Sequence, residues 1–305
     1  MEGIRLLRKV LFFSLIFILS ACSSTDEVKR TLTDTESAVL SRLDIDQVHE
    51  TILELTKEPR VAGTESESNA AAFLRTQLEQ YGYEVDEKTF TLDGSTEAKN
   101  KSQNLIVTKK PTSDLPSTDD IIIIGAHYDS VVHSPGASDN ASGTAVLLEV
   151  ARMLKDTITS KEIRIIFFGA EEAGLAGSEN YVSEMSTDDI ERTIAMFNLD
   201  MVGSADAGPL TMFTVDGLPN TATNTGNIAN ENLFGKSLPV KSSDQSDHYP
   251  FYNAGIDAVV FTHYPLEKAY HSANDTIDKL SKERVENIVL IISMSILELT
   301  ATKSE

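Results

Sequence analysis

Cysteine and tryptophan are nearly missing from this chain. Its 305 residues contain one cysteine, Cys22, and no tryptophan. One cysteine cannot form an internal disulfide, so the stability of the fold must come from a packed core. The 16 glycines and 9 prolines are scattered, which argues against fibrous and low-complexity proteins. With 41% hydrophobic residues and no internal repeat, the chain is predicted to form a globular protein.

Basic residues are also scarce. Lysine and arginine total 26 against 47 aspartates and glutamates, which gives a formal net charge of −21. A surface of this sign repels the phosphate backbone of nucleic acids. We therefore expect no nucleic-acid partner, and we expect the protein to be a monomer.

The apolar run at the amino terminus, Val10 to Leu19, is too short to span a bilayer. Basic residues precede it, and Leu19-Ser20-Ala21-Cys22 resembles the bacterial lipobox, whose cysteine carries lipid and becomes the mature amino terminus. A plain secretory signal with an incidental cysteine is the alternative. We expect a lipoprotein signal peptide at residues 1–22, a flexible tether at residues 23–40 and a folded domain at residues 41–305. The protein is then extracytoplasmic and anchored to the bacterial cell membrane through lipid on Cys22.

Hydrophobic periodicity predicts helices that alternate with strands. Apolar residues recur at helical spacing over Asp44–Leu55 and Ser66–Tyr81. Continuous apolar runs, typical of strands buried on both faces, occupy Ile121–Ile124 and Ile163–Phe168. Further strands are predicted at Val85–Leu92, Asn104–Thr108, Ile194–Leu199, Leu210–Val215 and Ala258–Thr262, and further helices at Ala141–Leu154, Leu175–Met185, Asn220–Asn232 and Lys279–Leu299. The pattern indicates an α/β fold, a three-layer α/β/α sandwich with a mostly parallel mixed central sheet.

Acidic residues and histidines follow three successive predicted strands. His127 and Asp129 follow the first, Glu171 and Glu172 the second, and Asp200 the third. Asp139 stands just before the helix that follows the first of these strands. In open α/β sheets the ligand crevice lies beyond the carboxyl ends of the strands. Imidazole nitrogen and carboxylate oxygen are ligands that zinc accepts, so this edge of the sheet is a candidate metal site.

Five ordered segments resemble the signatures of the M28 family of zinc aminopeptidases. They are Ala126-His127-Tyr128-Asp129-Ser130, Gly136-Ala137-Ser138-Asp139-Asn140-Ala141-Ser142-Gly143, Phe168-Gly169-Ala170-Glu171-Glu172-Ala173-Gly174-Leu175, Asn198-Leu199-Asp200-Met201-Val202-Gly203 and Tyr270-His271-Ser272-Ala273-Asn274-Asp275-Thr276. One such match would be weak, but the ordered set from residue 126 to residue 276 is strong. The resemblance implies that residues 41–305 are a peptidase catalytic domain that acts on peptides.

Carried over residue by residue, the resemblance implies two zinc ions per chain. Asp139 would bridge the two ions. His127 and Asp200 would complete the ligands of one ion, and Glu172 and His271 those of the other. The resemblance also implies a cis peptide bond between Asp139 and Asn140.

Three further residues are candidate catalytic groups. Asp129, two residues beyond His127, is placed to accept the second N–H of that histidine, as metal-bound imidazoles usually require; a solvated loop acid is the alternative. Glu171 resembles the general base that takes a proton from water and hands it to the leaving amine, and a surface acid is the alternative. Tyr270 precedes His271, where some family members have a tyrosine that hydrogen-bonds the oxyanion; core packing explains it equally well.

The function that the resemblance implies is hydrolysis of amino-terminal residues from peptides. Glutaminyl cyclases of the same superfamily rely on tryptophans, which this chain lacks, and one of these precedes the last histidine ligand, where this chain has Tyr270. A carboxypeptidase of the superfamily stays possible, because nothing in the sequence identifies a receptor for a substrate carboxylate. A surface lipoprotein that binds peptide or metal without catalysis is less favoured, because it would not need Glu171.

Overall fold

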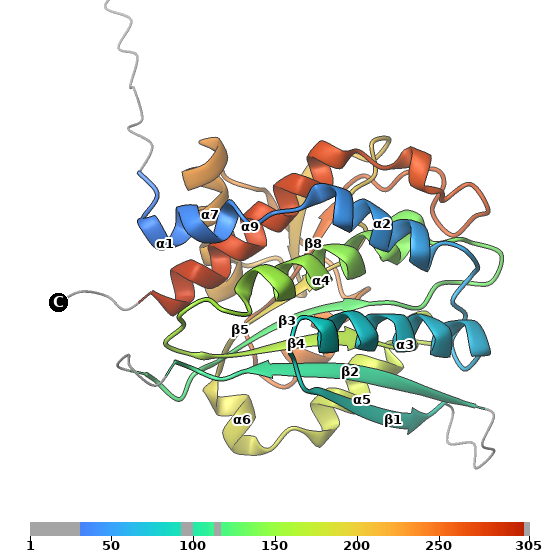
Figure 1. Cartoon of the computed structure of the whole chain (residues 1–305), viewed down its shortest axis with the longest axis horizontal. Helices are drawn as coiled ribbons and strands as arrows, with labels where there is room; N and C mark the ends of the chain where they lie inside the picture. The colour runs from blue at the N-terminus through green and yellow to red at the C-terminus, as the bar shows by residue number, and fades with distance from the viewer. Residues whose placement is uncertain (1–30, 93–99, 113–116, 302–305) are drawn as a thin grey trace, which may run out of the picture.

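The sheet at the centre of the protein is mixed, and it lies between two helical layers (Figure 1). The computed structural model describes residues 31–92, 100–112 and 117–301. The strand order in the sheet is β1-β2-β4-β3-β5-β8-β6-β7. The strands are β1 (Val85–Thr91), β2 (Lys101–Lys109), β3 (Ile121–His127), β4 (Glu162–Phe168), β5 (Thr193–Leu199), β6 (Leu210–Thr214), β7 (Val240–Ser242) and β8 (Ala258–His263). Strands β3, β4, β5 and β8 run parallel, whereas β2 and β6 are antiparallel to their neighbours β4 and β8. The predicted α/β sandwich is confirmed.

Helices cover both faces of the sheet. The larger layer holds α1 (Asp34–Leu40), α2 (Ile45–Leu55), α3 (Glu65–Gln80), α4 (Gly143–Leu154), α7 (Thr221–Phe234) and α9 (Lys282–Thr300). Figure 1 shows α2, α3, α4 and α9 on the near face of the sheet. The opposite face is covered by α5 (Ala176–Glu184), α6 (Thr187–Arg192) and α8 (His248–Asn253). A π-helical turn, η1 (Ala137–Ser142), precedes α4, and a 3-10 turn, η2 (Ile277–Lys279), precedes α9.

Strand β3 shows why the sequence favours two helical layers. Its isoleucines alternate, because Ile122 and Ile124 pack into the core under α4 and α9, while Ile121 and Ile123 face the core under α5 and α8. Successive side chains of a strand point to opposite faces of the sheet. A strand that is apolar at every position must therefore be covered on both sides.

Most predicted elements agree with the structure to within a few residues, and the differences are in short elements. Helix α2 begins after Asp44, whose side chain accepts from the Gln47 N–H. Helix α6, strand β7 and helix α8 were not predicted. They have six, three and six residues, too few for a hydrophobic period to show.

The predicted tether is wrong at its carboxyl end. Residues 34–40 form helix α1, which begins at Thr33 with a capping box made with Glu36. Val39 is buried in the core that includes α4 and α9. Leu40 also packs against this core. Polar residues dominate the segment, so its composition alone indicated a flexible tether.

Cys22 and the predicted signal peptide lie outside the described residues. In the described part of the chain, no helix combines the length and the apolar composition that crossing a membrane requires.

Candidate metal centre

The five predicted zinc ligands come together at the carboxyl ends of the parallel strands. His127 is the last residue of β3, Asp200 follows β5, and Glu172 follows β4. Asp139 lies in η1, and His271 in the segment between β8 and α9. His127 Nε2 lies 3.3 Å from Asp139 Oδ1 and 3.4 Å from Asp200 Oδ1. His271 Nε2 lies 3.1 Å from Asp139 Oδ2 and 3.2 Å from Glu172 Oε2. Asp139 therefore presents one carboxylate oxygen to each histidine.

These spacings fit zinc. Ligand atoms about 2.0–2.1 Å from a tetrahedral zinc ion lie roughly 3.3 Å from one another. The four distances between ligand atoms, 3.1 to 3.4 Å, match that value. Among the described residues, two groups could hold a metal ion: Asp139 with Glu172 and His271, and His127 with Asp200 and Glu171. Two oxygens of this set, Glu172 Oε1 and Asp200 Oδ1, are buried without a hydrogen-bond partner. A buried carboxylate oxygen without a donor is expected where a cation binds.

Crowded acids disturb the pKa values of the centre. Burial lowers the pKa of His127, but Glu171 and the other surrounding carboxylates outweigh burial and raise it well above its usual range. Burial and the negative charge of Asp139 raise the pKa of Glu172 to about 8. The pKa of Asp139 is lowered although burial opposes this, because His127 and His271 both hydrogen-bond to its carboxylate. Divalent cations would relieve this repulsion and keep the acids ionised.

Asp129 braces the loop that carries the two glutamates. Its Oδ1 accepts the Glu171 N–H at 3.0 Å, and its Oδ2 accepts the Glu172 N–H at 3.1 Å. His127 Nδ1 lies 3.3 Å from Asp129 Oδ1, on the side of the ring away from the other ligands. Asp129 is therefore positioned to orient both His127 and the Glu171–Glu172 turn.

The loop that bears Asp139 is held from two distant parts of the chain. Asp275 accepts the N–H groups of Ser138 at 2.7 Å and Asp139 at 3.0 Å. Arg60, 1% exposed, donates from its guanidinium to the carbonyls of Tyr128, Leu55, Pro135 and Gly136. The peptide bond between Asp139 and Asn140 is cis, which confirms the expectation from the sequence resemblance.

Asp200 has supporting partners of its own. Ser246 Oγ donates to Asp200 Oδ2 at 2.7 Å, and Asn198 Nδ2 donates to Ser246 Oγ at 2.7 Å. This chain of donors sets the orientation of the Asp200 carboxylate. Sequence reasoning assigned no role to Arg60, Asp275 or Asn198. Asp275 and Asn198 stood inside the resembling motifs, but Arg60 lies far before them and carried no signal.

A cavity of about 310 Å³ opens over the metal centre. Its acidic floor consists of Asp139, Glu171, Glu172 and Asp200, and its walls include Met201, Phe213, Val260, Thr262, Tyr264, Leu266 and Tyr270. No lysine or arginine lines this cavity among the residues that the structure describes. Tyr270 is 40% exposed, and its ring stacks on that of His271 with 3.8 Å between centroids. Glu171 is partly buried, and this burial together with Asp247 and Asp200 raises its pKa well above the usual range although His127 opposes this.

Comparisons with known proteins identify relatives. The model of peptidase family M28 matches residues 104–296. Aminopeptidase YwaD of Bacillus subtilis is 41% identical over 228 residues, which cover 72% of this chain and 49% of that protein. The probable lipoprotein aminopeptidase LpqL of Mycobacterium tuberculosis is 38% identical over 130 residues, which cover 42% of this chain and 24% of that protein. The chain thus spans half or less of the length of these curated relatives.

Two solved structures are similar over most of the chain. An aminopeptidase from Aneurinibacillus sp. strain AM-1 superposes with a TM-score of 0.83 at 30% identity and covers 88% of this chain and 97% of its own. BSAP, a zinc aminopeptidase from Bacillus subtilis, superposes with a TM-score of 0.75 at 25% identity and covers 90% of this chain and 98% of its own. The similarity to these structures extends beyond residues 104–296, and it includes the fold that surrounds the metal centre.

Proposed function

The chain belongs to peptidase family M28, and from this premise we propose that it is a zinc-dependent aminopeptidase that removes amino-terminal residues from peptides. The observation that carries the proposal is the acidic cavity over the metal centre. Its floor is formed by carboxylates, and no described lysine or arginine lines it. A substrate carboxylate finds no cationic side chain there, whereas Glu171, the one floor carboxylate that would not bind zinc, attracts a substrate ammonium group. The cavity therefore favours an aminopeptidase over a carboxypeptidase.

Two zinc ions per chain are part of the proposal. His127, Asp139 and Asp200 would hold one ion, and Asp139, Glu172 and His271 the other, which fits the ligand spacings of 3.1 to 3.4 Å. When bound, zinc polarises the scissile carbonyl and lowers the pKa of the attacking water. Ser246, Asp275 and Asp129 would keep these ligands in place, because each hydrogen-bonds to a ligand or to the backbone beside one.

Glu171 is the proposed general base. A carboxylate oxygen of Glu171 lies within 4.8 Å of candidate ligand atoms of His127 and Asp200. The residue also lines the cavity in which the substrate would bind. The hydrogen bond from its backbone N–H to Asp129 holds the carboxylate over the cavity. Glu171 would accept the proton of the attacking water and pass it to the leaving amine. A general base works best when its pKa lies near the working pH, and burial of Glu171 moves the pKa in that direction.

Tyr270 is proposed to stabilise the oxyanion. Its ring stacks on that of His271, both residues line the cavity, and Tyr270 is partly exposed, so a substrate bound in the cavity would lie against it. A hydroxyl that donates to the developing negative charge lowers the barrier of peptide hydrolysis. Glutaminyl cyclisation is less favoured, since the chain has no tryptophan.

The remaining proposals concern location and assembly. We propose that Cys22 carries lipid and that the protein is extracytoplasmic, in keeping with its similarity to a protein named as a probable lipoprotein aminopeptidase. A monomer and a signal peptide at residues 1–22 stay predictions.

The test of function uses chromogenic aminoacyl substrates and the same substrates with an acetylated amino group. We expect cleavage of the free-amine substrates only, because the Glu171 carboxylate attracts a charged amine. Cleavage of peptides from the carboxyl end, or equal cleavage of the acetylated substrates, would overturn the proposal. Absence of any turnover with zinc present would leave the binding-protein alternative as the better one.

A further inference from the structure

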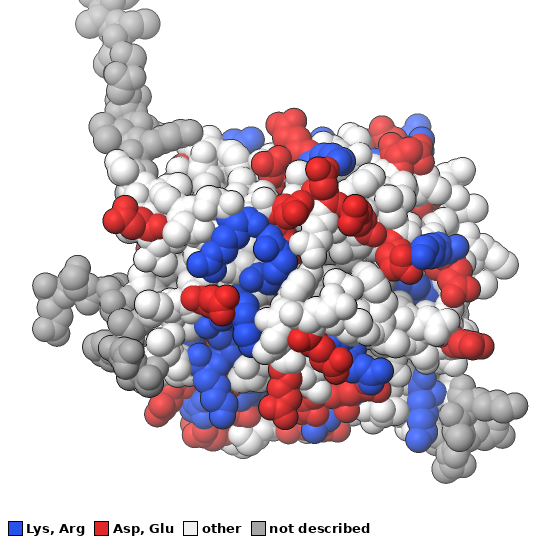
Figure 2. Space-filling view, in the orientation of Figure 1, with Lys and Arg blue, Asp and Glu red and all other residues white. Residues whose placement is uncertain are grey.

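Basic side chains gather at the edge of the sheet opposite the metal centre. The parallel strands β3, β4 and β5 begin at this edge and end at the metal centre. Lys109, at the end of β2, pairs in register with Ile163 at the start of β4. Arg152 and Lys155 lie at the carboxyl-terminal end of α4, and Arg42 follows α1. We call Arg42, Lys109, Arg152 and Lys155 the basic patch. Figure 2 shows the corresponding blue side chains gathered left of centre.

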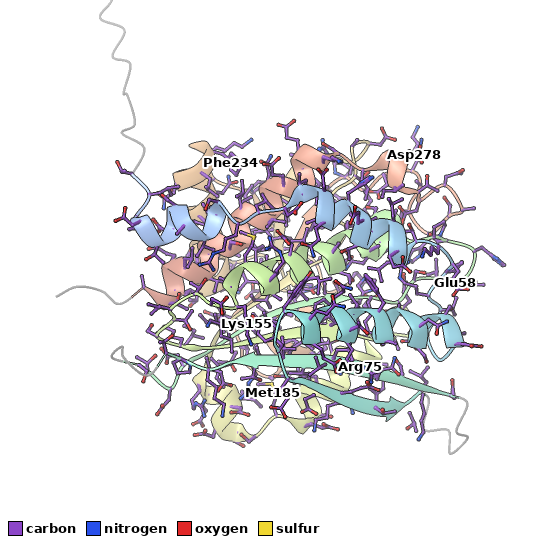
Figure 3. The ribbon with its side chains drawn as sticks, in the orientation of Figure 1. Glu58, Arg75, Lys155, Met185, Phe234 and Asp278 are labelled. Carbon is purple, nitrogen blue, oxygen red and sulfur yellow. The ribbon has the colours of Figure 1, made fainter. Side chains whose placement is uncertain are left out.

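Contacts within the basic patch hold its charges close together. Arg42 Nη1 donates to the Met153 carbonyl at 2.7 Å, and Lys109 Nζ donates to the Lys155 carbonyl at 3.1 Å. The Lys155 ammonium lies 4.2 Å from the centre of the Tyr83 ring, and Figure 3 labels this lysine on the same side of the molecule. Burial and the positive charge of Lys155 together lower the pKa of Lys109. The patch is thus a fixed group of cations rather than a set of freely moving chains.

The patch stands out against the charge of the whole chain. Three acids among the described residues interact with it, because Glu149 pairs with Arg152 at 2.7 Å, the charge of Asp44 also acts on Arg152, and the charge of Asp156 acts on Lys109. Four cations and these three acids leave a net charge of +1, in a chain whose formal net charge is −21. Positive charge on this one edge is therefore a local feature that the composition hides.

An exposed apolar side chain lies beside the patch. Ile158, in the connection between α4 and β4, is 60% exposed. Cations next to an exposed large apolar side chain are typical of surfaces that bind the interface of a membrane. Helix α1 is also at this edge, and Cys22 stands twelve residues before Asp34. At about 3.3–3.6 Å per residue, that length reaches at most roughly 40 Å. Lipid on Cys22 would therefore keep this edge near the bilayer.

We propose that the basic patch and Ile158 dock on an anionic membrane surface and thereby hold the metal centre facing away from the bilayer. This inference rests on the proposed lipid anchor at Cys22 and not on the proposed catalysis. Each lysine or arginine near an anionic bilayer strengthens binding roughly fivefold, so a net charge of +1 contributes roughly fivefold. This gain alone would give only weak membrane binding to a protein without a lipid anchor. For an anchored chain the docking is intramolecular, at an effective concentration of the order of millimolar, so a weak contact is enough to set the orientation.

The test compares two labels on the lipid-anchored full chain in vesicles. The thiol of Cys22 is consumed by lipidation, so Ile158→Cys and Val132→Cys each introduce one free thiol for a fluorophore. Val132 is 59% exposed and follows β3 at the metal-centre edge, which makes it a matched control. In phosphatidylglycerol vesicles with a headgroup quencher, we expect several-fold stronger quenching at position 158 than at position 132. High salt, or phosphatidylcholine vesicles, should remove the difference, because charge is screened or absent.

Charge variants complete the test. Lys109→Gln with Lys155→Gln should abolish the difference between the two labels, whereas Lys57→Gln with Lys282→Gln, at lysine side chains 65% and 54% exposed elsewhere, should preserve it. Equal quenching of both labels in anionic vesicles, or equal effects of the two double variants, would overturn the proposal. A chain that floats with neither vesicle lacks the anchor, which also refutes this orientation. Peptidase activity of the same samples tests the proposed function separately.

Discussion

Replacing Arg60 with methionine should weaken both the fold and the binding of zinc. Arg60 is 1% exposed, and its guanidinium donates four hydrogen bonds to backbone carbonyls at 2.6 to 3.0 Å. Burial lowers its pKa to about 10, so it remains charged at neutral pH. Two of the acceptors, the carbonyls of Pro135 and Gly136, belong to the segment that leads into Asp139. The Arg60 side chain therefore connects the loop between α2 and α3, which carries it, to the loop that bears Asp139; we call the latter the metal loop.

The size of the effect follows from the carbonyls left behind. Each buried carbonyl without a donor costs about 1–3 kcal/mol, and removal of a buried cation returns part of that cost. The free energy of unfolding of Arg60→Met should therefore be lower by about 3–5 kcal/mol. This is a large part of the roughly 5–15 kcal/mol that stabilises a typical domain. Lysine at this position keeps the charge but not the planar set of donors. The stability of Arg60→Lys should therefore lie between that of the unchanged protein and that of Arg60→Met.

Urea unfolding of the metal-free protein and calorimetric titration with zinc measure the two effects. The matched control is Arg75→Met, because Arg75 is 44% exposed and pairs with Glu87 at 3.0 Å on the surface. Such a pair contributes about 0–1 kcal/mol. If Arg60→Met were no less stable than Arg75→Met and bound zinc as tightly as the unchanged protein, the assignment of Arg60 as the support of the metal loop would be refuted.

Three further predictions concern the metals, the two adjacent glutamates and acid stability. Activity should disappear with a chelator and return fully only at two equivalents of zinc, and full activity at one equivalent would contradict the two-metal proposal. Glu171→Gln should retain both zinc ions and substrate affinity while kcat falls by about 10²–10⁴-fold, the usual cost of losing a general base. Glu172→Gln should instead bind one zinc ion more weakly and recover partly in excess zinc, so elemental analysis that found the reverse pattern would refute both roles. Burial lowers the pKa of His263 from 6.5 to about 4, so the unfolded chain takes up a proton at higher pH than the folded chain does. Stability is then lost as the pH falls from about 6.5 to about 4, by roughly 3 kcal/mol at about 1.4 kcal/mol per pH unit. His263→Asn keeps a donor for the Gly208 carbonyl, which His263 Nδ1 contacts at 3.0 Å, and should flatten the plot of unfolding free energy against pH in this range; an unchanged slope would show that another group is responsible.

Several features of the candidate site could be predicted because their signals are local in the chain. His127, Glu172 and Asp200 each stand at or just after the end of an apolar strand, and the ends of parallel strands meet at one edge of a sheet. The spacing of residues within each motif then sufficed to name Asp139 and His271 by resemblance. The continuous apolar runs of β3 and β4 likewise determined that the sheet is covered on both faces, since no other arrangement buries them.

The supports of that site, and the surface opposite it, were decided by tertiary structure alone. Arg60 meets the Gly136 carbonyl across 76 positions of the chain, and Asp275 meets Ser138 across 137. No hydrophobic period or spacing rule reports a contact at such separations, because it arises only when the sheet brings the loops together. The same is true of the basic patch, in which Arg42 lies against Met153 across 111 positions. Composition and sequence motifs therefore determined the family of this protein, whereas the packing of distant segments decided which residues support its candidate metal ligands and which face bears the basic patch.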